Sequence, residues 1–66
     1  MTISDFTEKE LDYFRTNCNF VNFEKKIFEG RAKGISLQNL SEELNISYDY
    51  ARYLSRKVNK KIIKVL

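Results

Sequence analysis

The sequence predicts a small all-α domain of four helices, and three observations support this prediction. The chain has 66 residues, enough for one domain with a small core. It has no proline and only two glycines, so helical segments meet few interruptions. Apolar residues recur three and four positions apart, which is the period of an amphipathic helix. We therefore expect a single domain over residues 1–66, with helices at about 8–16, 22–33, 37–44 and 48–65.

The first helix is placed at about residues 8–16 by a start signal. Thr7 and Glu10 have the spacing of a capping box, and Phe6 and Leu11 have that of a hydrophobic staple around it. Residues 16–19 are poor helix formers and should form the first loop. The side chains expected to face the core are Leu11, Phe14 and Cys18.

The second helix, at about residues 22–33, is expected to be the most buried, because it has a wide apolar stripe. Asn22 is its expected cap, with Asn19 as the alternative. Gly34 fits the left-handed position that ends a helix. The stripe consists of Phe20, Phe23, Ile27, Phe28 and Ala32.

Residues 36–57 have the pattern of a helix-turn-helix unit. Ser36 is placed to cap the helix at 37–44, and Ser47 to cap the helix at 48–65. Asn45 lies between them, and asparagine tolerates the positive φ that a sharp turn needs. Ile46 should fill the core under the turn. The last helix should direct towards the core Ala51, Leu54, Val58, Ile62 and Val65.

Charge is unevenly distributed along the chain. Residues 1–30 have four basic and six acidic side chains, whereas residues 31–66 have eight basic and three acidic ones. From Tyr50 to the end there are six basic residues and no acidic one. Such asymmetry favours a polyanionic partner, and a solvated helix face is the alternative.

Several classes of function are not expected. The lone Cys18 and the absence of histidine exclude a Cys/His zinc site and catalysis by a Cys–His pair. No motif for a metal, a phosphate loop or a nucleophile is present, so we expect neither an enzyme nor a cofactor. The amino terminus lacks the pattern of a secretory signal, and no apolar run approaches the length of a membrane span. A cytoplasmic protein is expected.

A helix-turn-helix protein places the amino-terminal part of its second helix against base edges in the major groove. Candidates for base readout are therefore Tyr48, Asp49, Arg52 and Tyr53. Candidates for phosphate contacts are Ser36, Gln38, Arg56, Lys57 and Lys60.

These candidates have alternative roles. Asp49 lies where a carboxylate favours the helix dipole without any ligand. Tyr53 is alternatively a packing aromatic, and Ser36 a plain cap. Tyr50 is expected in the core or at its boundary. Lys61 and Lys64 are expected to keep the helix end soluble and to complement its dipole.

The same region resembles a known family. The positions that fit a run of the type G-x-S/T-x-x-E-I-A-x-x-L-G-I-S are Gly34, Ser36, Leu40, Leu44, Ile46 and Ser47. This run resembles the fourth region of bacterial sigma factors and is similar to the output domains of LuxR-type response regulators. The resemblance extends from about residue 7 to residue 62, and the extra helix at 8–16 fits the sigma-like arrangement better. It implies a DNA-binding domain that also binds RNA polymerase.

The expected function is sequence-specific binding of duplex DNA by a small transcriptional regulator, with residues 48–65 as the recognition helix. The alternative is a protein-interaction module that binds RNA polymerase or another transcription protein. Ile63 and Leu66 lie beside the core stripe of the last helix, and they either widen the core or pair two copies as a homodimer.

Overall fold

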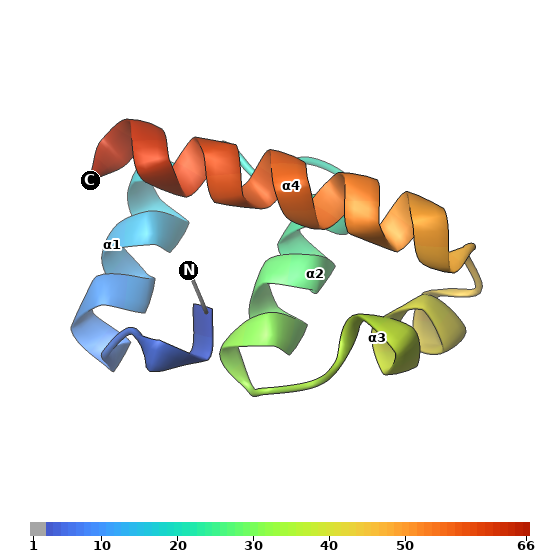
Figure 1. Cartoon of the computed structure of the whole chain (residues 1–66). Helices are drawn as coiled ribbons and strands as arrows, with labels where there is room; N and C mark the ends of the chain where they lie inside the picture. Colours follow the sequence, from blue (N-terminus) through green and yellow to red (C-terminus); the bar gives the residue numbers. More distant parts are fainter. Residues whose placement is uncertain (1–2) are drawn as a thin grey trace.

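The computed structural model describes residues 3–66 and confirms the all-α fold (Figure 1). Four α-helices follow a short 3-10 helix, η1, at Ile3–Asp5, and residues 3–66 contain no strand. The α-helices are α1 at Glu8–Asn17, α2 at Phe23–Ala32, α3 at Leu37–Leu44 and α4 at Tyr48–Val65. Each lies within one residue of its predicted bounds.

The predicted capping box begins α1. Thr7 Oγ1 accepts a hydrogen bond from the Glu10 N–H at 3.2 Å, and Glu10 Oε1 accepts one from the Thr7 N–H at 2.8 Å. Cys18 ends the helix in an extended conformation, with its N–H bonded to the Phe14 carbonyl at 2.8 Å. The first loop therefore begins two residues later than predicted.

The predicted side-chain cap of α2 is wrong. Asn22 occupies the cap position, but its backbone has a φ of 52° and its side chain makes no capping hydrogen bond. A cap residue normally has an extended backbone, which directs its side chain at the first turn. The side chain of Glu24 instead turns back to the residue before the cap, where its Oε1 accepts from the Val21 N–H at 3.2 Å.

A residue with a left-handed backbone follows α2, and another follows α3, as predicted. Gly34 has a φ of 85° and Asn45 a φ of 56°. The Ile35 N–H bonds the Gly30 carbonyl, and the Ile46 N–H bonds the Ser41 carbonyl, both at 3.0 Å. These are the long hydrogen bonds of two Schellman motifs.

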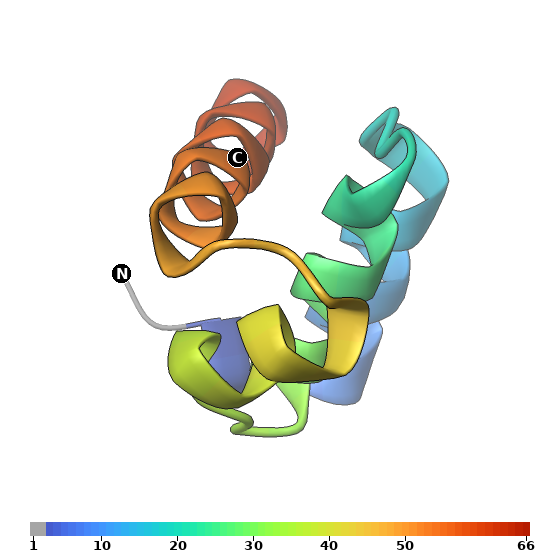
Figure 2. The same cartoon turned by 90° about the vertical axis from the view of Figure 1, so that its right-hand side faces the viewer.

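A serine side chain caps the first turn of α3, and another caps the first turn of α4. Ser36 Oγ accepts from the Asn39 N–H and Ser47 Oγ from the Tyr50 N–H, both at 3.1 Å. The turn between α3 and α4 is therefore only three residues long, at 45–47. Figure 2 shows that the two helices cross steeply: α4 is seen almost end-on, while α3 runs across the view.

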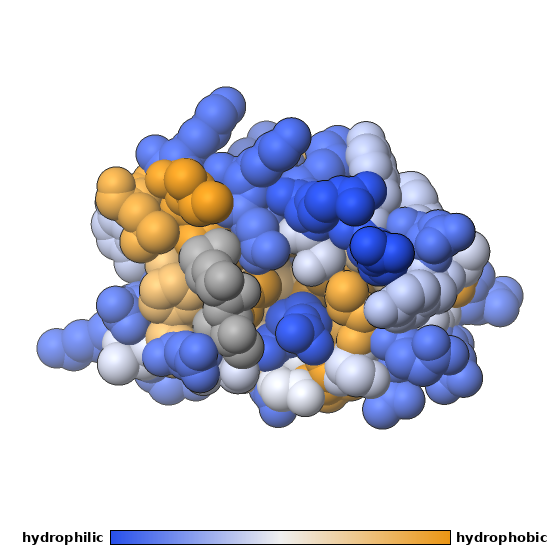
Figure 3. All heavy atoms as spheres, viewed as in Figure 1, coloured by the Kyte–Doolittle hydropathy of each residue, from blue (hydrophilic) through white to orange (hydrophobic). Residues whose placement is uncertain are grey.

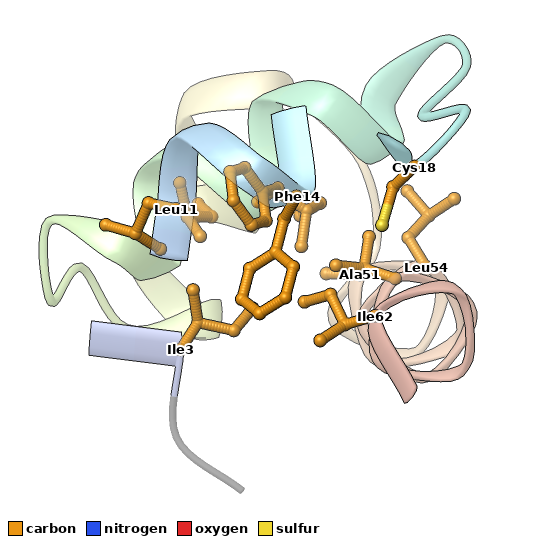
Figure 4. Packing of buried hydrophobic residues seen from close by; sticks show 11 residues of the cluster. Ile3, Leu11, Phe14, Cys18, Ala51, Leu54 and Ile62 are labelled. Atoms are coloured by element: carbon orange, nitrogen blue, oxygen red, sulfur yellow. The ribbon is translucent and has the colours of Figure 1, made fainter. Parts of the chain in front are cut away.

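The core lies between α4 and the other three α-helices, all of which α4 contacts (Figure 4). The stacked rings of Phe20 and Phe28 lie 4.7 Å apart between centroids, and Phe6 meets Phe14 edge-on at 4.9 Å. Of the predicted stripe on α2 only two residues are fully buried, and Phe20, Phe23 and Ala32 are partly so, as are Ile46 and Val65. The buried hydrophobic residues are Ile3, Leu11, Phe14, Cys18, Ile27, Phe28, Leu40, Ala51, Leu54, Val58 and Ile62.

Helices α2 and α3 approach closely at Gly30. A Cβ atom at this position would overlap Leu40 Cδ2 and lie 3.0 Å from Leu40 Cδ1. Leu40 is itself buried, with 3% of its surface exposed, so it has little room to move. The absence of a side chain at Gly30 thus lets α3 lie against α2.

The left-handed turn residue should be sensitive to substitution. Changing Asn45 to alanine should lower the free energy of unfolding by about 1 kcal/mol, because alanine tolerates the positive φ of this position less well than asparagine does. The matched variant Asn45→Gly should not be destabilised. Urea unfolding followed by circular dichroism measures both variants. Equal stability of the alanine variant and the unchanged protein would contradict this prediction.

Candidate nucleic-acid interface

Helix α4 lies along one side of the molecule with its outer face uncovered (Figures 1 and 2). Its amino-terminal half holds all four predicted base-reading residues, and all four are exposed: Tyr48, Asp49, Arg52 and Tyr53. Arg56 and Lys60 continue the exposed face, and Ser36 and Gln38 are exposed at the start of α3. Figure 3 shows hydrophilic side chains over most of α4 and a hydrophobic group at its carboxyl-terminal end.

Three cations on this face are free to meet an anion. No carboxylate within residues 3–66 lies at ion-pair distance from Arg52, Arg56 or Lys60. The Arg52 guanidinium lies 6.0 Å from the centre of the Tyr48 ring. That contact holds the arginine beside the start of the helix, which reduces the freedom it would lose on binding.

Lys57 differs from the other predicted phosphate contacts. Its Nζ atom lies 3.5 Å from Glu24 Oε2 and 5.5 Å from the centre of the Tyr53 ring. Its side chain is 44% exposed, so the ammonium still reaches solvent. A phosphate would compete with Glu24 for this charge, and Lys57 should therefore contribute less to anion binding than Arg56 or Lys60.

Tyr50 does not lie in the core or at its boundary, as the sequence led us to expect. It is 43% exposed, and its ring stacks on that of Tyr53 with centroids 6.1 Å apart and planes at 18°. Tyr50 is turned by about 100° from Ala51, the fully buried residue next to it, and that rotation takes it to the side of the helix. The two tyrosines form an exposed aromatic pair.

Comparison with known proteins gives no family for this chain. No protein-family model, curated protein sequence or solved structure matches it. What is established is therefore the fold, a small domain of four α-helices.

In the part of the chain that the structure describes, no helix is long and apolar enough to cross a membrane. The same residues contain no cluster of histidine, cysteine, aspartate and glutamate that could hold a metal ion.

An ion pair that the sequence did not reveal fixes α4 against the rest of the molecule. Glu24 is only 2% exposed, and its Oε1 lies 2.5 Å from Lys61 Nζ. The same ammonium donates to the Asn19 carbonyl, also at 2.5 Å. Lys61 therefore does more than keep the helix end soluble, because it neutralises a buried carboxylate 37 positions earlier in the chain.

The surroundings of Glu24 alter its pKa. Burial alone would raise the pKa of this carboxyl, but the hydrogen bond from Lys61, the Val21 N–H and the charges of Lys61 and Lys57 outweigh burial and lower it. The pKa of Glu29 is also lowered, mainly by its hydrogen bonds from Arg15 at 2.7 and 2.8 Å. That second pair is partly exposed and should matter less.

The lowered pKa of Glu24 predicts a loss of stability in acid. A carboxyl that ionises more readily in the folded chain stabilises the fold above its ordinary pKa of about 4.3, and this contribution disappears as the pH falls through the folded-state value. The urea midpoint should therefore fall between about pH 5 and pH 3. In Glu24→Gln the decline should be shallower. An identical pH profile for that variant would show that other carboxyls dominate.

The carboxyl-terminal end of α4 has a different character. Ile63 is 60% exposed and Leu66 72% exposed. Beside them lies a groove of about 390 Å³, which is lined by Lys9, Glu10, Tyr13, Phe14, Val65 and Leu66. The interpretation that Ile63 and Leu66 widen the core is thus not supported, because both side chains face solvent.

Proposed function

We propose that this domain binds duplex DNA in a sequence-specific manner as a small transcriptional regulator. The observation that carries the proposal is the outer face of α4, where Arg52, Arg56 and Lys60 are exposed and have no carboxylate partner among residues 3–66. An uncompensated cationic helix face is the electrostatic footprint of a nucleic-acid-binding protein. If this face of α4 were only a solvated surface, leaving its cations without carboxylate partners would bring the protein little benefit.

The shape of α4 supports major-groove binding. An α-helix with its side chains is about 10–12 Å across, which matches the width of the major groove, about 12 Å. With 18 residues, α4 is about 27 Å long. The three-residue turn before it and the steep crossing of α3 leave its first turns uncovered (Figure 2). The start of α3, with its exposed Ser36 and Gln38, would then lie near a phosphate.

The residues of α4 divide into two roles under this proposal. Arg52 is the strongest candidate for base readout, because an arginine can donate two hydrogen bonds to a guanine edge. Tyr48 and Tyr53 flank it, and Asp49 is placed either to accept from a cytosine amino group or to favour the helix dipole. Arg56 and Lys60 lie further along and would contact phosphates.

The resemblance to the fourth region of sigma factors agrees with this proposal. The positions that carry it have structural roles that a helix-turn-helix needs. Gly34 is left-handed, and Ser36 and Ser47 cap the two helices. Asn45 stands where the family usually has glycine, and it also has a left-handed backbone. The start of α4 departs from that family, since residues 48–50 read Tyr-Asp-Tyr. We therefore expect a DNA site of its own rather than a promoter element.

Binding to duplex DNA across a salt series tests the proposal. If three phosphates are neutralised, the logarithm of the association constant should fall with the logarithm of salt concentration with a slope of about −3. Lys60→Ala should reduce the slope by about 1 and weaken all sequences alike. Lys9→Ala, which removes an exposed lysine of α1, is the matched control. Absence of duplex binding at low salt would refute the proposal.

The apolar end of α4 favours a second candidate, a protein-interaction module. Ile63 and Leu66 are exposed beside an apolar groove, and such patches commonly mark protein contacts. RNA polymerase, another transcription protein or a second copy of the chain would be the partner. Capture of polymerase without any DNA affinity would favour this function. Sedimentation of the Ile63→Ser variant beside the unchanged protein tests the homodimer.

A further inference from the structure

We infer that the side of α4 next to the proposed duplex-binding face holds an unpaired nucleic-acid strand. This surface is a tyrosine–lysine stripe, defined by Tyr50, Tyr53, Lys57, Lys60 and Lys64. Tyr53, Lys57 and Lys60 are also candidates for duplex contacts, so the two surfaces meet along these residues, whereas Tyr50 and Lys64 belong to the stripe alone. The inference rests on the proposed function and adds to it, because it places a single strand beside the duplex. The domain would then prefer DNA whose duplex is open at one end over fully paired DNA.

The stripe is continuous along the helix. Its members follow one another at intervals of three, four, three and four residues, which keeps them on one side of an α-helix. A groove of about 360 Å³ runs beside them and is lined by Tyr53, Lys57, Lys60, Lys61 and Lys64. Lys60 and Lys64 have no carboxylate at ion-pair distance within residues 3–66, so they are the lysines that would neutralise the phosphates of a single backbone. Lys57 and Lys61 are engaged by Glu24 and would contribute less.

The exposed tyrosines indicate whether the bases of the bound strand are paired or unpaired. Bases in an intact duplex are stacked on one another and present only their edges in the grooves. An exposed aromatic ring can stack on the face of a base that has left the duplex, and such stacking is worth about 1–3 kcal/mol per base. An aromatic pair joined to a lysine row is therefore better matched to an unpaired strand than to paired DNA.

The order of the stack identifies the binding position. One side of Tyr53 faces Tyr50, and the Lys57 ammonium lies 5.5 Å from its ring centre. Tyr50 ends the row, and no further ring or cation within residues 3–66 stacks on it. A base would therefore stack on Tyr50, and the strand would continue past Tyr53 along the lysines.

Fluorescence anisotropy with four probes tests the inference. The probes are a blunt duplex, the same duplex with a ten-nucleotide single-stranded extension, and that extension alone as DNA and as RNA. Tyr50→Leu should weaken binding of the extended and single-stranded probes about ten-fold and leave the blunt duplex within two-fold. Tyr50→Trp should restore binding, since tryptophan also stacks. Tyr13→Leu, a change at an exposed tyrosine of α1, is the control.

The possible results separate this inference from the proposed function. Equal loss on the blunt duplex would overturn the inference and make Tyr50 part of the duplex contact. No change on any probe would also overturn it and assign the aromatic pair to a protein partner. Single-strand binding without duplex binding would refute the proposed function but would support the inference that the tyrosine–lysine stripe binds an unpaired strand. Equal effects on DNA and RNA would show that the sugar is not read.

Discussion

Replacing Lys61 with methionine should lower the free energy of unfolding by about 3 kcal/mol at neutral pH. The substitution removes the hydrogen-bonded partner of a carboxylate that is 2% exposed, and breaking a buried ion pair on one side typically costs about 3–5 kcal/mol. Lys57 remains 3.5 Å from the other oxygen, which keeps the cost at the lower end of that range. For a domain of this size that is most of its stability. Urea unfolding at pH 7 measures the loss.

The opposite substitution, Glu24→Gln, should cost less, about 1–2 kcal/mol. The Lys61 side chain is 29% exposed and can turn its ammonium to water once the carboxylate is gone, whereas Glu24 has no such exit. The double variant Glu24→Leu with Lys61→Met should recover most of the stability, because an apolar pair of similar volume fits a buried site. Lys64→Met, on the same helix but exposed, should change stability by less than about 0.5 kcal/mol. Equal losses for Lys61→Met and Lys64→Met would contradict the argument.

The sequence predicts the helices well because their ends are specified locally. Thr7 and Glu10 are three residues apart, and Ser36, Asn45 and Ser47 act on their own turns, so the spacing of residue types was sufficient. The helical period likewise placed Ala51 in the core and Arg52 outside it. All of these features involve residues close together in the chain.

The features that were missed depend on contacts between distant residues. Lys61 meets Glu24 across 37 positions, and no local pattern distinguishes it from Lys60 or Lys64. One signal was available: Glu24 lies on the apolar side of α2, three residues before Ile27, where a carboxylate requires a partner. Tyr50 was misplaced for a different reason. An aromatic next to the core stripe can turn inward or outward, and the packing of α4 decides which.

Two arginines one turn apart on α4 should affect DNA recognition differently. Arg52→Ala should reduce discrimination between the preferred duplex and a random one by about 1–3 kcal/mol, because one bidentate contact to a guanine edge is lost. Arg56→Ala should weaken both duplexes similarly, because a phosphate contact carries no sequence information. Both side chains are exposed, so neither substitution should disturb the fold.

Selection of bound sequences from a random duplex pool, first with the unchanged protein, supplies the preferred site. Anisotropy titrations of each variant on the selected and random duplexes then give the ratio of affinities. We expect that ratio to fall roughly ten-fold in Arg52→Ala and to stay constant in Arg56→Ala. Equal loss on both duplexes in Arg52→Ala would move this residue to the phosphate contacts. Base readout would then be assigned to Tyr48 and Tyr53, which flank Arg52 at the start of the helix. The Tyr48 ring would in that case contact a base instead of holding the Arg52 guanidinium in place.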